Sequence, residues 1–181
     1  MKHTNKIVIT GLFAAILCVS APIVLPLPIS PVPVSLVPLV IFITSFILTP
    51  GACTMSVLVY LMLGAAGLPV FSGFTGGLGV LAGPTGGYLA GYLAAAFISS
   101  LFNNRFRQGF MHITGMITGL AAMYFTGTIW FTFQQDTGFL QALAVCVLPY
   151  LAGDAVKIAA AFLIGQKLRA YISRNNIIKG A

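Results

Sequence analysis

The sequence predicts an α-helical integral membrane protein, and two observations carry that prediction. Of the 181 residues, 59% are hydrophobic and only 6% are charged, and the mean hydropathy is +1.02. Soluble domains carry about a quarter charged residues. The apolar residues also fall into six blocks, each bounded by polar residues or by proline and glycine. Because the bilayer offers the backbone no hydrogen-bond partner, we expect these blocks to cross it as helices.

The six blocks predict six transmembrane helices within a single membrane domain, residues 1–181. A helix needs about 20 apolar residues to cross the hydrocarbon, and the second and third blocks are short by this measure. The first block could instead be a secretory signal, but it exceeds the usual length of about 7 to 15 residues. The predicted spans are Ile7–Leu25, Val34–Leu48, Ala52–Ala66, Gly86–Phe102, Phe110–Phe131 and Tyr150–Ala170.

The basic residues predict the orientation of these spans. The chain has nine Lys and Arg against two acidic residues, for a net charge of +7, yet the basic residues lie at the ends of apolar blocks rather than in a patch. This distribution argues against nucleic-acid binding and fits the enrichment of Lys and Arg on cytoplasmic loops. With six spans, one side carries both termini, so we expect a multi-pass protein of the cell (plasma) membrane with cytoplasmic N- and C-termini. The basic residues on that side are Lys2, Lys6, Arg105, Arg107, Lys167, Arg169, Arg174 and Lys179.

Three connections belong to the opposite, outer side: residues 26–33, 67–85 and 132–149, and none contains Lys or Arg. The first has proline at four of its eight positions, which favours a stiff, extended backbone. The second is rich in glycine and carries Phe71 and Phe74. A loop of this length is usually functional or disordered, and this one is too apolar for disorder. The alternative is that both loops only turn the chain at the bilayer surface.

The third connection contains an apolar run, residues 139–148, that is too short to span the membrane. We interpret it as an interfacial or re-entrant helix that ends at Pro149. The competing interpretation joins it to the last block as one very long sixth span. Trp130 and Tyr124, near the outer end of the fifth span, are interfacial anchors or pocket walls, and the sequence favours neither.

Asp154 and Lys157 are the ionisable side chains that lie well inside a predicted span. A charge in hydrocarbon costs about 2.5–3.5 kcal/mol even on insertion scales, so something must compensate it. The i,i+3 spacing places both on one helix face, near the outer start of the sixth span. Such a pair offers an acceptor and a donor to a small molecule beneath the outer loops. The alternative is that the two charges neutralise each other and only hold helices together.

Other chemistries find little support in the sequence. Cys18, Cys53 and Cys146 stand apart from one another, and His3 and His112 have no partner residues nearby in sequence, so we predict neither a metal site nor a cofactor. The phosphate-binding pattern GxxxxGK[ST] is absent, so any pumping must be powered by a partner or an ion gradient. A membrane-embedded enzyme using Asp154 and Lys157 would lack a nucleophile or metal, so we predict that the chain is not an enzyme.

The first span presents a stripe of small residues at i, i+3, i+4 and i+7: Gly11, Ala14, Ala15 and Cys18. Small residues let a second helix approach closely, so this stripe is a candidate docking face for a partner subunit. Stripes of this kind also pack helices within one chain.

Four motifs resemble the BioY family, the biotin-specific S components of energy-coupling factor (ECF) transporters. They are Pro26–Pro33, which ends in SPVP; Gly64–Phe71, GAAGLPVF; Gly83–Tyr88, GPTGGY; and Gly153-Asp154 followed by Lys157. The resemblance covers nearly the whole chain. It implies six helices with cytoplasmic termini and capture of biotin from outside. It also implies inward delivery together with a transmembrane T component and two ATPase subunits.

The resemblance also implies roles for particular residues. Asp154 and Lys157 would bind the ureido end of biotin. The AxxxA-type docking motif of the family begins here at Ala14, but its second alanine is replaced by Cys18. An S component for another vitamin and a solitary facilitator without ATPases are the alternatives. By the same resemblance, the rest of the biotin molecule would be contacted by Tyr88, Phe71, Phe74 and the backbone around Gly73 and Gly86.

Overall fold

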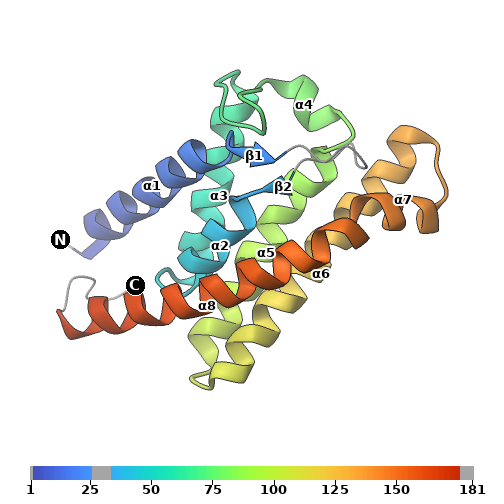
Figure 1. Ribbon diagram of the computed structural model, residues 1–181. Helices are drawn as coiled ribbons and strands as arrows, with labels where there is room; N and C mark the ends of the chain where they lie inside the picture. The colour runs from blue at the N-terminus through green and yellow to red at the C-terminus, as the bar shows by residue number, and fades with distance from the viewer. Residues whose placement is uncertain (1, 26–33, 176–181) are drawn as a thin grey trace.

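The computed structural model describes residues 2–25 and 34–175, which form a bundle of helices with one small antiparallel hairpin (Figure 1). Residues 26–33, and with them the predicted stiff proline loop, lie outside the described residues. The helices are α1 (Lys2–Ser20), α2 (Val37–Ser45), α3 (Pro50–Ala65), α4 (Leu78–Ala82), α5 (Gly86–Arg105), α6 (Gly109–Gln135), α7 (Phe139–Cys146) and α8 (Leu151–Arg174), and the strands are β1 (Val24–Leu25) and β2 (Val34–Ser35).

The first two helices differ from the predicted spans at their hairpin ends. α1 stops at Ser20, because Pro22 disfavours helical backbone at the residue before it and cannot donate its own hydrogen bond. The chain then forms β1, which pairs with β2. α2 begins only at Val37, whose N–H donates to the Ser35 hydroxyl at 3.1 Å. Pro38 follows in the first turn, where a missing N–H costs nothing.

α5 and α6 form a closely packed antiparallel hairpin. A side chain on Gly91 would collide with α6 near Met123, and a side chain on Gly119 would meet Ala95 and Ser99 of α5. Small residues at such contacts are the usual means of close helix approach in membranes. The pair thus gives the bundle a firm central unit against which α2 and α3 pack.

A buried polar network ties α2 to the C-terminal end of α5. The Asn103 side-chain amide donates to the Ser45 hydroxyl at 2.7 Å, and the Ser100 hydroxyl donates to the Leu48 carbonyl at 2.8 Å. Arg169 of α8 adds a 2.7 Å bond from its guanidinium to the Asn103 carbonyl. The ends of α2, α5 and α8 therefore meet at one end of the bundle.

We call this end the basic end. Arg105 and Arg107 lie at the α5–α6 turn there, and α8 brings Arg169 beside them. The middle of α1, from Ile9 to Ile16, lines the same apolar groove as Leu168 and Ile172 of α8, and the N-terminal end of α1 points toward the basic end (Figure 1). The hairpin β1–β2, α4 and α7 lie toward the opposite end, which we call the pocket end.

α7 packs on the parts of α5 and α6 nearest the pocket end and is separated from α8 by a single 3₁₀ turn, Leu148–Tyr150. A short helix is therefore present before Pro149, ending at Cys146, and its placement as an interfacial or re-entrant segment stays a prediction. Among the described residues, two segments are long and apolar enough to cross a membrane. They are Gly109–Gln135 and the stretch Phe139–Arg174 that joins α7 to α8, with mean hydropathies of 1.3 and 1.7. The count of six spans stays a prediction.

Candidate functional site

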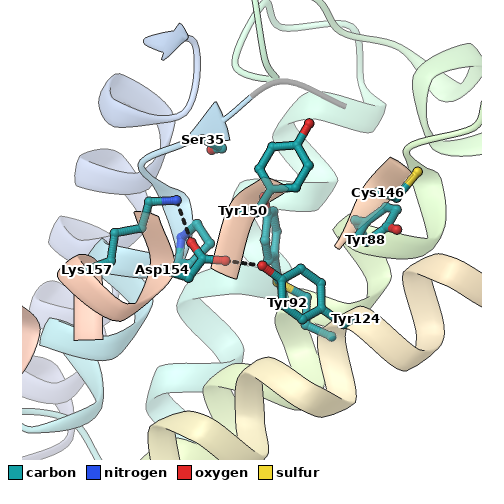
Figure 2. Close-up of a pocket in the computed structure, with 10 residues that line it drawn as sticks. Ser35, Tyr88, Tyr92, Tyr124, Cys146, Tyr150, Asp154 and Lys157 are labelled. Carbon is teal, nitrogen blue, oxygen red and sulfur yellow. Dashed lines mark hydrogen bonds and ion pairs between the residues drawn. The ribbon is translucent and has the colours of Figure 1, made fainter. Parts of the chain in front are cut away.

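Asp154 is the centre of a polar site at the pocket end. The first turn of α8 holds it 3% exposed, where the positive end of the helix dipole favours an anion. Its Oδ1 accepts a 2.7 Å bond from the Lys157 ammonium, one turn along the same helix. Its Oδ2 accepts a hydrogen bond from the Tyr124 hydroxyl of α6 (Figure 2). The carboxylate is thus balanced by one opposite charge and one neutral donor.

The ion pair explains why two charged side chains are tolerated inside an apolar bundle, because each charge neutralises the other. The Lys157 side chain is only 12% exposed and that of Asp154 only 4%, so neither is well solvated. Removing one partner of such a pair leaves an uncompensated buried charge, which typically costs about 3–5 kcal/mol. The two residues therefore act as a unit.

A cavity of about 40 Å³ opens beside the ion pair and is walled mainly by tyrosine. The walls come from the hairpin and from α2, α5, α6, α7 and α8 (Figure 2). Tyrosine gives an apolar ring surface with one polar tip, which suits a ligand that is partly polar. The lining residues are Ser35, Pro38, Tyr88, Tyr92, Met123, Tyr124, Cys146, Tyr150, Asp154 and Lys157.

A second cavity, of about 160 Å³, lies next to the first and is more distant from the charges. Ser35, Tyr88 and Tyr92 line both cavities and form the partition between them. The far wall includes Phe71 and Thr85. Together the two cavities make an elongated site with a charged end and a largely apolar end.

The Tyr88 ring is fixed by its neighbours. Gly127 of α6 leaves the space that the ring occupies, since a Cβ there would overlap the ring. The Tyr88 hydroxyl lies 3.3 Å from the Thr128 hydroxyl, and Cys146 of α7 packs against the same cluster. Residues of α6 and α7 thus hold this α5 side chain in the position where it lines both cavities.

The structure brings four of the predicted binding residues to the site. Asp154, Lys157 and Tyr88 line the first cavity, and Phe71 lines the second. The Phe71 ring is 1% exposed and packs edge-on against Tyr60, with ring centroids 5.6 Å apart. It therefore closes the apolar end of the site.

The other three predicted binding residues do not line either cavity. Phe74 is 70% exposed at a backbone φ of 59°, so the turn directs its ring outward. The Gly73 N–H donates to the Pro22 carbonyl at 3.2 Å, which ties this loop to the turn that follows α1. Gly86 begins α5 directly against the Leu81 backbone, where a Cβ could not fit. The two glycines thus shape the loop that carries Phe71.

Ser35, Tyr92 and Tyr150 are lining residues that the sequence did not single out. Tyr92 was detectable in principle, since Tyr88 and Tyr92 are four residues apart and share one face of α5. Tyr124, predicted as either an anchor or a pocket wall, lines the pocket. Trp130 donates from its indole N–H to the Gly83 carbonyl at 2.9 Å and so ties α6 to the loop before α5.

The small-residue stripe of α1 divides between two faces. Ala14 is buried and Cys18 packs against the core of the same chain. Gly11 and Ala15 are exposed, and nothing lies within 4 Å of a Cβ built on Gly11. A partner helix would therefore meet Gly11 and Ala15, whereas Ala14 and Cys18 serve packing within the chain.

The fold and the site define a membrane-embedded binding protein: a helical bundle in which a buried pair of opposite charges, Asp154 and Lys157, lines a pocket with four tyrosines. The chain belongs to the BioY family, whose family model matches residues 1–174.

Relatives and a solved structure agree with that assignment. The chain is 35% identical over 165 residues to a probable biotin transporter BioY of Pyrococcus horikoshii, covering 91% of this chain and 96% of the relative. It is 34% identical over 165 residues to the biotin transporter BioY of Thermotoga maritima, with the same coverages of 91% and 96%. A crystal structure of the S component for biotin from an ECF-type ABC transporter superposes with a TM-score of 0.85 at 26% identity, covering 93% of this chain and 92% of that one. The protein is thus a membrane protein of the S-component fold.

Proposed function

We propose that this chain is the biotin-binding membrane subunit of an ECF-type uptake transporter. It captures biotin at the outer face of the cell membrane and releases it inward, with energy supplied by a separate ATPase module. The observation that carries the proposal is the buried Asp154–Lys157 pair facing a tyrosine-walled pocket in a chain of the BioY family.

The polar end of the pocket suits the ureido ring of biotin. That ring offers two N–H donors and one carbonyl acceptor. The Asp154 carboxylate accepts from the N–H groups, while Lys157 and the Tyr124 hydroxyl can donate to the carbonyl. Hydrogen bonds to charged groups contribute about 1.5–3 kcal/mol each, so this end supplies most of the polar recognition.

The apolar end suits the fused ring system and the aliphatic chain. Phe71, Tyr88 and Tyr92 offer ring surfaces there, and we keep Phe74, Gly73 and Gly86 as residues that shape the loop over the ligand. The cavities of about 40 and 160 Å³ are smaller than the roughly 300–1,000 Å³ of typical small-molecule sites. We expect biotin to turn the Tyr92 side chain of the partition, while Tyr88 keeps its position, and so to join the two cavities.

The proposed orientation places the pocket end outside and the basic end, with both termini, in the cytoplasm. It is supported by the chain's charge distribution, because Arg105, Arg107 and Arg169 gather at the basic end, whereas the outer connections contain neither Lys nor Arg. The ligand would then enter beneath the outer loops. A transmembrane T component would contact the chain within the membrane, and two ATPase subunits would act from the cytoplasmic side.

Biotin binding is tested with the purified full-length chain from cells grown without biotin. At a free biotin concentration one hundred times the Kd, we expect stabilisation by about 2.7 kcal/mol, measured as a rise in Tm, and biotin retained after purification from biotin-containing medium. Riboflavin and thiamine serve as control ligands and should give no shift. A shift with a control vitamin but none with biotin would reassign the substrate. Uptake that persists without any ATPase module would identify a solitary facilitator.

Docking to the T component is tested on the exposed side of α1. We expect Ala15→Leu to reduce biotin uptake by cells at least about tenfold, because a bulky residue prevents close helix approach. Biotin binding by the purified variant should be unchanged, since Ala15 lines neither cavity of the site. Ala121→Leu, at another exposed alanine on α6, is the matched control and should transport normally. Normal uptake by both variants would remove this face of α1 from the interface.

A further inference from the structure

A second polar cavity lies at the basic end and has no part in the biotin site. Its volume is about 510 Å³, and its walls come from the α5–α6 turn, the first turn of α6 and the last turns of α8. Asp154 and Arg169 are 15 positions apart on α8, which separates the two sites by about 22 Å along the helix. We call it the basic cavity; it is lined by Arg107, His112, Gln166, Arg169, Ala170 and Ser173.

No side-chain carboxylate among the described residues neutralises the two guanidinium groups of this cavity. The acidic side chains of the whole sequence are Asp136 and Asp154, and both belong to the pocket end. Arg169 donates one N–H to the backbone carbonyl of Asn103. Among the described residues Arg107 makes neither a hydrogen bond nor an ion pair, so its five donors are available.

The start of α6 adds further anion-binding character. Gln108 is the N-cap without a side-chain cap hydrogen bond, and no acidic residue occupies the first turn. The first N–H groups of a helix lack partners within it and carry the positive end of its dipole. The Gln166 amide nitrogen lies beside this helix start, 3.7 Å from a Cβ position built on Gly109.

His112 contributes a buried nitrogen that lacks a partner. The ring is 5% exposed, and its Nε2 lies 2.9 Å from the Phe106 carbonyl, which fixes its orientation. Its Nδ1 has no hydrogen-bond partner among the described residues. Nδ1 is therefore open to a hydrogen bond with a group bound in the cavity that His112 lines.

We propose that the basic cavity binds the phosphate group of an anionic lipid. Arginine matches phosphate oxygens through paired N–H donors, and two arginines converge here from separate elements. Basic cavities between helices at the end of their spans lie at the depth of lipid head groups. Phe110 and Tyr171, beside the lining residues in sequence, are 74% and 62% exposed and offer apolar surface to the acyl chains.

The experiment uses the full-length chain in nanodiscs of neutral phosphatidylcholine, with or without one fifth phosphatidylglycerol. We expect phosphatidylglycerol to raise the Tm of the wild type, and native mass spectrometry to find the lipid retained. Arg107→Gln should lower that retention about tenfold, since it removes charge-assisted bonds to the phosphate. The matched control is Arg105→Gln, an equal loss of charge two positions away outside the cavity lining, which should behave as wild type. A cooperative transition in neutral nanodiscs verifies that each variant is folded.

Two further arms make the result decisive. Inorganic phosphate added to neutral nanodiscs tests a free anion: stabilisation equal to that by the lipid, and lost in Arg107→Gln, would overturn the lipid in favour of a soluble phosphate. Equal retention of phosphatidylglycerol by the Arg107 and Arg105 variants would overturn the site itself. Neither arm involves biotin, so failure here leaves the transport assignment standing.

Discussion

Asp154→Asn is expected to lower the affinity for biotin about a hundredfold, which corresponds to roughly 2.7 kcal/mol. The asparagine keeps the shape of the side chain but replaces the charge and turns one acceptor into a donor. That donor would oppose both the ureido N–H groups of the ligand and the Lys157 ammonium. Titration calorimetry with the purified variant, alongside its Tm without ligand, measures the effect.

The chain supplies its own matched control for this substitution. Asp136, its other acidic residue, lies at the C-cap of α6 with a φ of 48° and does not line the pocket. Asparagine tolerates this left-handed backbone well, so Asp136→Asn should fold and bind normally. Wild-type affinity in a folded Asp154→Asn protein would show that the ion pair serves helix packing alone.

Gly127→Ala is expected to reduce both stability and binding. The added methyl group would occupy the space of the Tyr88 ring, and overpacking of this kind usually costs about 1–3 kcal/mol. Because Tyr88 lines both cavities, its displacement should also weaken biotin binding. Thermal unfolding in detergent and biotin titration measure the two effects.

Two comparisons isolate the contact between Gly127 and Tyr88. Gly51→Ala makes the same change in α3 at a position with nothing within 4 Å, so its stability should be nearly unchanged. In a double-mutant cycle, Tyr88→Ala removes the ring, so adding Gly127→Ala to it should cost far less than in the wild type. Additive effects would mean that the glycine is needed for some other reason.

Composition and residue pattern were sufficient to predict a helical membrane protein, because burial in lipid leaves few alternatives for an apolar chain. The ends of the helices were harder to predict from the sequence. The sequence around Pro22 suggested a span that runs on to Leu25, whereas the backbone forms a hairpin that needs a partner strand ten residues later. Pairing of this kind is a tertiary event, and local propensity cannot predict it.

The binding site also has parts that the local sequence predicts and parts that depend on tertiary packing. Asp154 and Lys157 could be found because an intramembrane charge is costly and their spacing is local. Tyr124 meets Asp154 across 30 positions of sequence, so only the packing of α6 on α8 reveals the contact. Phe71 and Phe74 are both aromatic residues of one glycine-rich loop. The turn between them decides that one ring is buried and the other exposed.

The hydrogen bonds that the Asp154 carboxylate makes within the protein have a consequence for selectivity. Both carboxylate oxygens accept a hydrogen bond from a side chain of the protein itself, one from Lys157 and one from Tyr124. An incoming molecule must exchange these internal partners for its own. A compound that lacks paired donors and an acceptor at one end would displace these partners and leave the buried Asp154 or Lys157 charge without a hydrogen-bond partner. We expect the protein not to bind such a compound, even at high concentration.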